Sequence, residues 1–269
     1  TESLSFLLKG GYTHYEDGGA GSLYERKCGG GRTTPLATGG VADPFADCAV
    51  DGRADHNASN PAFVENFRYA RNGELFTDLN SYFTVLTGNL ETDTFNVTSI
   101  TGYSQFSQTD FNDFVGAVRN VAVSQFAKFK QMSQEVRIAS DFEGPFNFTV
   151  GGYYSDSSFI FNTDSHNVNF GFDPVRRTYV SFSRDNGFDA KSFSLFGQAS
   201  WEILPTLELS GGARWSSDQR DSYQQSRATA ATAANAAFPQ DRRFDDNFDD
   251  TNLSPEVTLT WKPSRDVTF

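Results

Sequence analysis

The chain has 269 residues, a formal net charge of −12 and an aromatic content of 15% that includes 27 Phe. This acidic balance argues against a nucleic-acid partner, because no basic surplus is available to displace the counterions of phosphates. No run of about 18 apolar residues occurs, which excludes a transmembrane helix. The abundance of Phe and Tyr, with only one Met, favours an all-β fold over a helical one.

Alternation of apolar and polar residues predicts nine β-strands along the chain. In chain order they cover residues 3–15, 80–91, 94–106, 131–140, 146–158, 191–203, 206–218, 252–262 and 266 onward. A strand that crosses a membrane in a barrel needs only about 10 such residues, so the pattern is compatible with a membrane protein of low mean hydropathy.

The connections between these strands are of two kinds that alternate along the chain. Short ones, at residues 91–93, 141–145, 204–205 and 263–266, carry residues typical of turns. Long ones span residues 16–79, 107–130, 159–190 and 219–251. Strict alternation places all short turns at one end of the sheet and all long loops at the other, which is the plan of an outer-membrane barrel. A soluble sandwich stays possible, but that fold does not require every second connection to be long.

The predicted sixth to eighth strands each have one apolar and one polar side. In the sixth strand Phe193 and Leu195 occupy odd positions, whereas Ser194 and Glu202 occupy even ones. In a soluble sheet the polar side would be solvated, whereas in a barrel it would line the lumen while the apolar side met lipid. The sequence therefore predicts part of an antiparallel transmembrane β-barrel, with short periplasmic turns and long extracellular loops.

Three tryptophans share the apolar side and are predicted to mark the two membrane interfaces. Trp201 and Trp261 lie close to short turns, whereas Trp215 lies about 10 residues beyond the turn at Pro205. At about 3.3 Å per residue and a tilt of about 40°, this spacing carries Trp215 roughly 25 Å across the wall, to the opposite interface.

Five segments resemble the barrel region of TonB-dependent receptors in their order and spacing. They are MSQEVRIAS at residues 132–140, EGPFNFTVGGYYSD at 143–156, FGQASWEI at 196–203, LELSGGARWSSDQRD at 207–221 and LSPEVTLTWKPSRDVTF at 253–269. The resemblance implies a receptor in the bacterial outer membrane that imports a scarce nutrient, such as a siderophore, cobalamin or a glycan. It implies no catalysis and no cofactor.

The resemblance also implies partners: outer-membrane lipid, a plug domain of the same protein, the inner-membrane TonB complex and a small-molecule ligand. The family barrel is similar to a cylinder of about 22 strands closed around its plug. With nine strands and no plug, residues 1–269 are expected to be an internal piece of one barrel domain. Inward-facing charges are expected to hold the plug, namely Glu135, Arg137, Glu208, Arg214 and Glu256.

Long loops on a rigid barrel are the expected place for ligand recognition. The third long loop is the strongest candidate because its aromatic and basic residues can stack on or charge-pair with a ligand. The candidate ligand-binding residues are Phe159, Phe161, Phe170, Phe172, Arg176, Arg177 and Tyr179. The alternative is that these aromatics pack against neighbouring loops.

The sequence offers two further candidate sites, a cysteine pair and an acidic stretch. Cys28 and Cys48 lie in one Gly-rich segment and are predicted to form a disulfide rather than a metal site, which would need more ligands. The acidic stretch from Asp245 to Glu256 matches the ligand spacing of a calcium loop, but Asp250 occupies the position that needs Gly, so a solvated acidic loop is expected. The rival functions are a passive porin and a non-membrane structural or adhesive protein.

Overall fold

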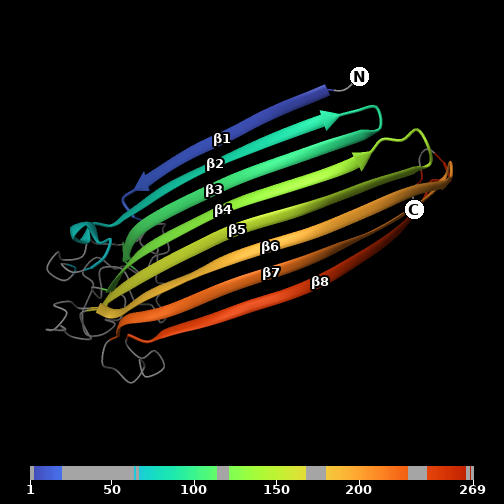
Figure 1. Cartoon of the computed structure of the whole chain (residues 1–269). Helices are drawn as coiled ribbons and strands as arrows, with labels where there is room; N and C mark the ends of the chain where they lie inside the picture. The colour runs from blue at the N-terminus through green and yellow to red at the C-terminus, as the bar shows by residue number, and fades with distance from the viewer. Residues whose placement is uncertain are drawn as a thin grey trace, which may run out of the picture.

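A computed structural model describes residues 3–19, 64, 67–113, 121–167, 180–229, 241–264 and 267. Within these residues the chain forms one antiparallel sheet whose spatial order follows the sequence, from β1 to β8 (Figure 1). The strands are β1 (Ser3–Asp17), β2 (Phe76–Glu91), β3 (Phe95–Asp113), β4 (Val121–Ser140), β5 (Phe146–Asn167), β6 (Val180–Leu204), β7 (Leu207–Thr229) and β8 (Arg243–Trp261). A short 3-10 turn, η1 (Arg71–Gly73), precedes β2. The predicted all-β architecture is confirmed.

The short connections lie together at one end of the sheet, as predicted (Figure 1). They join β2 to β3, β4 to β5 and β6 to β7. In the first, the backbone N–H of Thr92 donates to the carbonyl of Phe95 at 2.8 Å, and the N–H of Phe95 donates to Thr92 Oγ1 at 2.9 Å. Neighbouring turns also bond each other, since the N–H of Asp141 donates to the carbonyl of Thr94 at 2.8 Å and that of Glu202 to the carbonyl of Pro145 at 2.7 Å. The backbone groups of the turns are thus paired within this end of the sheet.

Eight of the nine predicted strands are confirmed, but their ends toward the long connections were placed wrongly. β4 begins at Val121 rather than at residue 131, and β5 extends past Phe159 and Phe161, which therefore lie on a strand and not in a loop. At this end both sides of the strands carry polar residues, so the alternation that reveals a strand disappears while the ladder continues. The ninth predicted strand lies outside the described residues, except for Val267, which forms a single bridge with Ser264.

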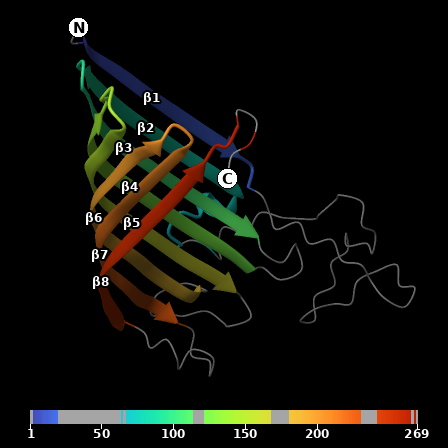
Figure 2. The same cartoon turned by 90° about the vertical axis from the view of Figure 1, so that its right-hand side faces the viewer.

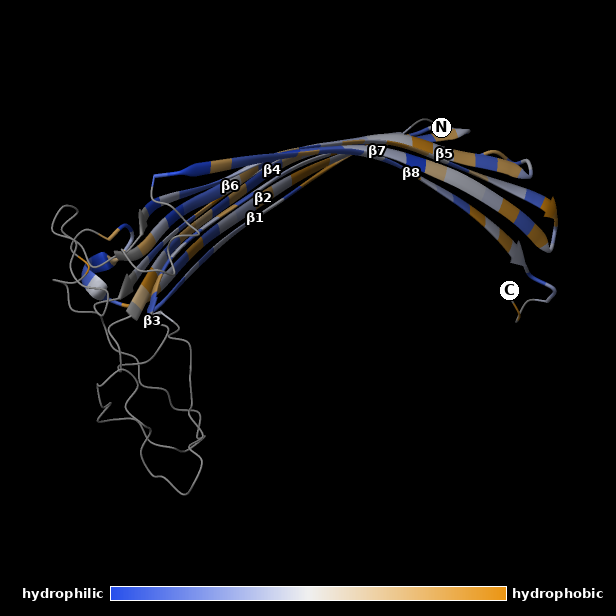
Figure 3. Ribbon diagram, turned by 90° about the horizontal axis from the view of Figure 1, so that it is seen from below, coloured by the Kyte–Doolittle hydropathy of each residue, from blue (hydrophilic) through white to orange (hydrophobic). Residues whose placement is uncertain are grey.

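Cross-strand pairing divides the side chains between two faces, because paired residues of an antiparallel ladder point to the same side. One side, called the apolar face, carries Leu90, Val97, Ile138 and Val150 as successive partners across β2 to β5. The other side, called the polar face, carries mainly Ser, Thr, Gly and charged residues at this level. Figure 3 shows this alternation of hydropathy along the strands of the bent sheet, and Figure 2 shows its twist.

An aromatic belt crosses the apolar face about midway along the strands. It consists of Tyr12, Tyr82, Tyr103, Tyr154, Phe193 and Trp215. Tyr12 pairs directly with Tyr82, and the rings of Phe193 and Trp215 meet edge to face with centroids 6.1 Å apart. Beyond the belt, toward the long connections, the same face becomes polar.

The three tryptophans lie on the apolar face. Trp201 pairs with Leu209 and Trp261 with Leu207, both beside the short turns, whereas Trp215 belongs to the aromatic belt. The shared face and the two different heights match the spacing argument. Contact of these indoles with lipid stays a prediction.

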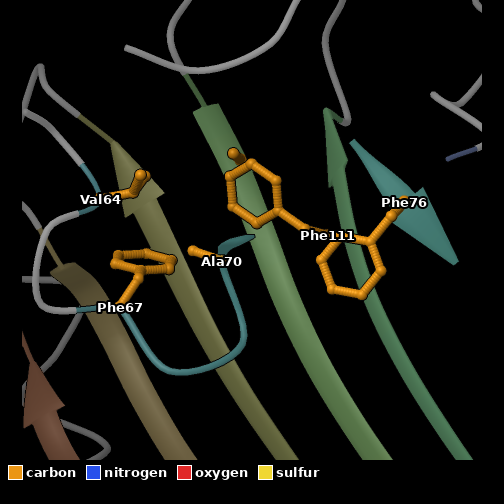
Figure 4. Packing of buried hydrophobic residues seen from close by; sticks show 6 residues of the cluster. Val64, Phe67, Ala70, Phe76 and Phe111 are labelled. Atoms are coloured by element: carbon orange, nitrogen blue, oxygen red, sulfur yellow. The ribbon is translucent and has the colours of Figure 1, made fainter. Parts of the chain in front are cut away.

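Only one small cluster of buried apolar side chains forms among the described residues, at the long-connection end of the sheet (Figure 4). It contains Val64, Phe67, Ala70, Phe76, Phe111 and Ala122. Elsewhere large apolar side chains are exposed, and Val257 reaches 78%. An apolar face this open requires a cover of lipid or protein. No described helix has the length and apolarity needed to span a membrane.

Candidate ligand-facing surface

The five charged residues predicted to face the lumen share the polar face, opposite the tryptophans. They are Glu135, Arg137, Glu208, Arg214 and Glu256. Their pairing partners are of both kinds: Gly151 is opposite Arg137 and Thr260 opposite Glu208, whereas Tyr153 is opposite Glu135 and Phe196 opposite Arg214. Contact of these charges with a plug domain stays a prediction.

Arg214 makes several contacts on this face. Its Nη2 donates to Ser194 Oγ at 3.0 Å, and its guanidinium carbon lies 5.9 Å from the centroid of the Phe196 ring. Ser194 is almost fully buried and also bonds Ser216 at 3.1 Å. The serines therefore hold the guanidinium against the wall while its exposed part stays available to a partner.

A row of four phenylalanines crosses the polar face of β3 to β6. Phe106, Phe129, Phe159 and Phe188 are direct partners from one strand to the next. The rings of Phe106 and Phe129 stack with centroids 5.9 Å apart, and those of Phe159 and Phe188 lie 5.6 Å apart. Phe161 stacks on Phe159 at 6.3 Å and widens the row.

The phenylalanine row lies beyond the aromatic belt, toward the long connections. On β3 Phe106 follows Tyr103 of the belt by three positions, and on β6 Phe188 precedes Phe193 by five. At about 3.3 Å per residue the row is about 10–16 Å along the strands from the belt. All of its rings are half-buried, so they offer apolar surface within a polar wall.

A hollow of about 650 Å³ adjoins this row on the polar face. Its lining includes Ser155, Ser157, Asp218, Arg220, Ser222 and Asp246. The guanidinium carbon of Arg220 lies 4.6 Å from the centroid of the Phe188 ring, which joins the hollow to the row. Hydroxyls, charges of both signs and aromatic faces together can orient a ligand that has polar and planar parts.

Sequence reasoning found only part of this surface. It named Phe159 and Phe161 but missed Phe106, Phe129 and Phe188, because only the register across four strands brings these residues together. The other five predicted ligand residues lie outside the described residues: Phe170, Phe172, Arg176, Arg177 and Tyr179. Cys28 and Cys48 also lie outside them.

A second polar cluster, the Arg68 clamp, ties the segment before β2 to the ends of β5 to β7. Arg68 donates from Nη2 to Asp164 Oδ1 and from Nη1 to Asp185 Oδ1, both at 2.7 Å. Ser183 Oγ donates to Asp164 at 2.5 Å, and Arg227 forms an ion pair with Asp185. Hydrogen bonding to Asp164, opposed by partial burial, raises the pKa of Arg68, so its charge is permanent.

The Arg68 clamp lies on the same side of the sheet as the aromatic belt. Phe76, Phe111, Ser124, Asp164 and Ser183 are successive partners in one row of that side. The clamp therefore stabilises the long-connection end of the wall and takes no part in the polar face with its phenylalanine row.

The arrangement of the described residues does not match a calcium loop. Asp245, Asn247 and Asp249 lie on β8, not in the expected acidic loop, and Glu256 points to the opposite face. His14 on β1 bonds Asn80 at 3.0 Å. Across the described strands and turns, no group of three His, Cys, Asp or Glu is placed to hold a metal ion.

Comparison with known proteins identifies the architecture. The family model described as TonB dependent receptor-like, beta-barrel matches residues 12–269. The ferric yersiniabactin uptake receptor FyuA from Yersinia pestis is similar with a TM-score of 0.59 and 13% identity, over 71% of this chain and 27% of that one. The open form of the ferric-catecholate import receptor Fiu from E. coli K12 is similar with a TM-score of 0.52 and 12% identity, over 97% of this chain and 42% of that one.

At such low identity these structures show the fold alone, and the chain spans less than half the length of either. No curated protein matches the sequence. The family comprises outer-membrane receptors and transporters, not enzymes. Since the family model covers nearly the whole chain, from Tyr12 on β1 to Phe269, the chain belongs to the TonB-dependent receptors and forms part of their β-barrel.

Proposed function

We propose that this chain forms part of the wall of a receptor in the bacterial outer membrane that imports a scarce nutrient with energy from TonB. The observation that carries the proposal is the two-sided sheet, whose apolar face is exposed below an aromatic belt while its polar face carries charges at the same level. This is how a barrel wall separates lipid from lumen. Family membership supports the energised form of transport over a passive porin.

The polar face supplies contacts for a plug domain. The TonB partner acts through that plug. Arg214, seated on Ser194 and Ser216, offers a fixed cation to a plug carboxylate. Such ion pairs in a wet lumen contribute about 1 kcal/mol or less each, so several must act together and can be released by force.

The ligand contacts the phenylalanine row and the adjoining hollow before it reaches the plug. Half-buried aromatic rings beside Arg220 and Asp218 suit a ligand with a planar part and charged or hydroxyl groups. Iron chelates are the first class to test, because the similar structures are a ferric yersiniabactin uptake receptor and a ferric-catecholate import receptor.

The test uses the full-length receptor. Binding of a ferric catecholate, a ferric hydroxamate and cobalamin to the purified protein is followed by fluorescence quenching, and uptake is measured in cells with and without TonB. Replacing both Phe129 and Phe159 by alanine should weaken binding of the recognised ligand at least about tenfold. The matched control is Phe196→Ala, which removes the same ring from the polar face nearer the short turns.

Uptake that continues at the same rate without TonB contradicts energised import. Uptake proportional to solute concentration, for solutes of unrelated chemistry, indicates the passive porin. Equal loss of binding in Phe196→Ala and the double variant contradicts the assignment of the ligand to the phenylalanine row.

A further inference from the structure

The hollow beside the phenylalanine row has an acidic side, which is formed by β7 and β8. Asp218 and Asp246 line the hollow, and Asp218 pairs directly with Asp250 on the polar face. Residues directly opposite each other have Cβ atoms about 5 Å apart, and like charges in such positions repel each other. The pair therefore destabilises the wall unless a cation lies close to both carboxylates.

The two neighbouring arginines of β7 are held elsewhere on the polar face. The guanidinium carbon of Arg220 lies 4.6 Å from the centroid of the Phe188 ring on β6, and Arg214 donates to a serine of the same strand at 3.0 Å. Within the described strands neither arginine forms an ion pair or a hydrogen bond with the paired carboxylates. The acidic side thus keeps its negative charge toward the lumen.

An aromatic ring lies in the middle of this acidic side. Phe248 lines the hollow, and along β8 it lies between Asp246 and Asp250, with all three on the polar face. Phe248 is 55% exposed, and Arg220, its direct partner, leans toward β6 and leaves the ring uncovered. A ring face among carboxylates attracts an ammonium or guanidinium group, because the quadrupole of the ring and the negative charges act in the same direction.

A buried hydroxyl group also lines the hollow. Ser155 is only 7% exposed, yet its Oγ has no hydrogen-bond partner in the part of the chain that the structure describes. It belongs to the same row of partners as Asp218, through Ser192 of β6. Because buried polar groups are normally hydrogen-bonded, this oxygen is expected to accept a bond from a group that enters the hollow. An ammonium group has three donors, enough for the serine and two carboxylates.

We propose that this hollow binds an organic cation, so that the imported nutrient carries an ammonium or guanidinium group. The cationic group lies against the Phe248 ring between the carboxylates of Asp218 and Asp246. A planar part of the ligand reaches the phenylalanine row, which is about 13 Å away along the strands, since Asp218 precedes Ser222, the partner of Phe188, by four positions. An iron chelate meets this requirement only if it carries such a group. The inference rests on the proposed function, because it takes the polar face as the side that meets the ligand.

The test measures the binding of three probes to the purified full-length receptor by saturation-transfer NMR. The probes share a phenyl ring and differ in charge: 2-phenylethylammonium, 2-phenylethanol and 3-phenylpropanoate. The double variant Asp218→Asn, Asp250→Asn keeps the shape of both side chains and should bind the ammonium probe about tenfold more weakly, with the neutral probe unchanged. Phe248→Leu should weaken binding of the ammonium probe about threefold. The matched control is Asp221→Asn, Asp249→Asn, which removes two carboxylates of the same strands from the opposite face.

The stability of the receptor without ligand provides a second readout. Because the paired carboxylates repel each other, the double variant should unfold at a higher urea concentration than the wild type, and 2-phenylethylammonium should raise the urea midpoint of the wild type alone. A double variant less stable than the wild type overturns the inference, because a cation of the protein then already neutralises the pair. Equal affinity of both proteins for the ammonium probe also overturns it, as does tighter binding of 3-phenylpropanoate. No readout involves TonB or uptake, so passive uptake would contradict energised transport without contradicting the cation site.

Discussion

Replacing Arg68 by methionine removes the cation of the Arg68 clamp and keeps much of the aliphatic volume of the side chain. Asp164 then loses the bonds from Nε at 3.0 Å and Nη2 at 2.7 Å, and keeps Ser183 and the backbone N–H of residue 68. Asp185 loses its 2.7 Å bond but keeps Arg227. The nearly buried carboxylate of Asp164 is therefore left without a cation.

Breaking a buried ion pair by removing one partner costs about 3–5 kcal/mol. The side chain of Arg68 is 30% exposed, whereas that of Asp164 is 5% exposed. Water can therefore replace part of what the guanidinium supplied, and the lower end, about 3 kcal/mol, is expected. Because the clamp joins one segment to the wall, the loss should appear as local opening, with amide exchange about a hundredfold faster in residues 67–76.

Hydrogen exchange of the full-length receptor, read by mass spectrometry, measures this opening. The matched control is Arg71→Met in the same segment, because Arg71 bonds Glu16 and Asp78 at an exposed site. Exposed pairs contribute about 0.2–1 kcal/mol each, so the loss of both should raise exchange there by no more than about 30-fold. Exchange in Arg68→Met that equals the wild type, or equals Arg71→Met, refutes the reasoning.

Three further predictions address the faces, a buried carboxyl group and the cysteines. Val257→Lys on the apolar face should destabilise the barrel by about 2–4 kcal/mol, and Glu256→Lys on the polar face by much less. Urea titrations, in which the folded fraction is measured by heat-modifiable gel mobility, compare the two variants. Equal losses of stability would contradict the face assignment. Burial raises the pKa of Asp110 above 3.8, so its contribution to stability is present below that pH and is lost as the pH rises through the folded-state pKa. The melting temperature of Asp110→Asn should therefore increase relative to that of the wild type as the pH rises to 7. A difference in melting temperature that does not depend on pH counts against this. Cys28 and Cys48 should form a disulfide that closes a loop of roughly 20 residues and adds about 3 kcal/mol; free thiols in the denatured, unreduced protein would exclude it.

The existence, order and pairing of the strands could be predicted because their signals are local. Each strand near the membrane alternates with a period of two, and each short turn carries residues such as Pro205 that stop a strand. The far ends were missed because apolar and polar residues no longer keep to separate sides there. Val121 to Lys130 extends β4 although Phe126 shares one side with Lys128, and Phe129 shares the other with Gln125.

The two side-chain clusters were beyond prediction because both depend on contacts distant in sequence. The Arg68 clamp joins residues 96 positions apart, from Arg68 to Asp164. The phenylalanine row needs the register of four strands, and one shifted residue would turn Phe129 to the other face. The charges of the polar face were predictable, since Glu208 and Arg214 follow the alternation within a single strand.

The strictly sequential strand order also governs how the sheet assembles. Strands joined by short turns can pair soon after both are available, whereas β1 and β2 must first close a connection of roughly 58 residues. Loop closure costs about 3 kcal/mol more for this length than for a two-residue turn. Arg71, bonded to Glu16 at 2.9 Å and Asp78 at 2.7 Å, links the two strands where that connection ends. Among the eight described strands, β1 should therefore be the last to join its neighbour and the first to leave it.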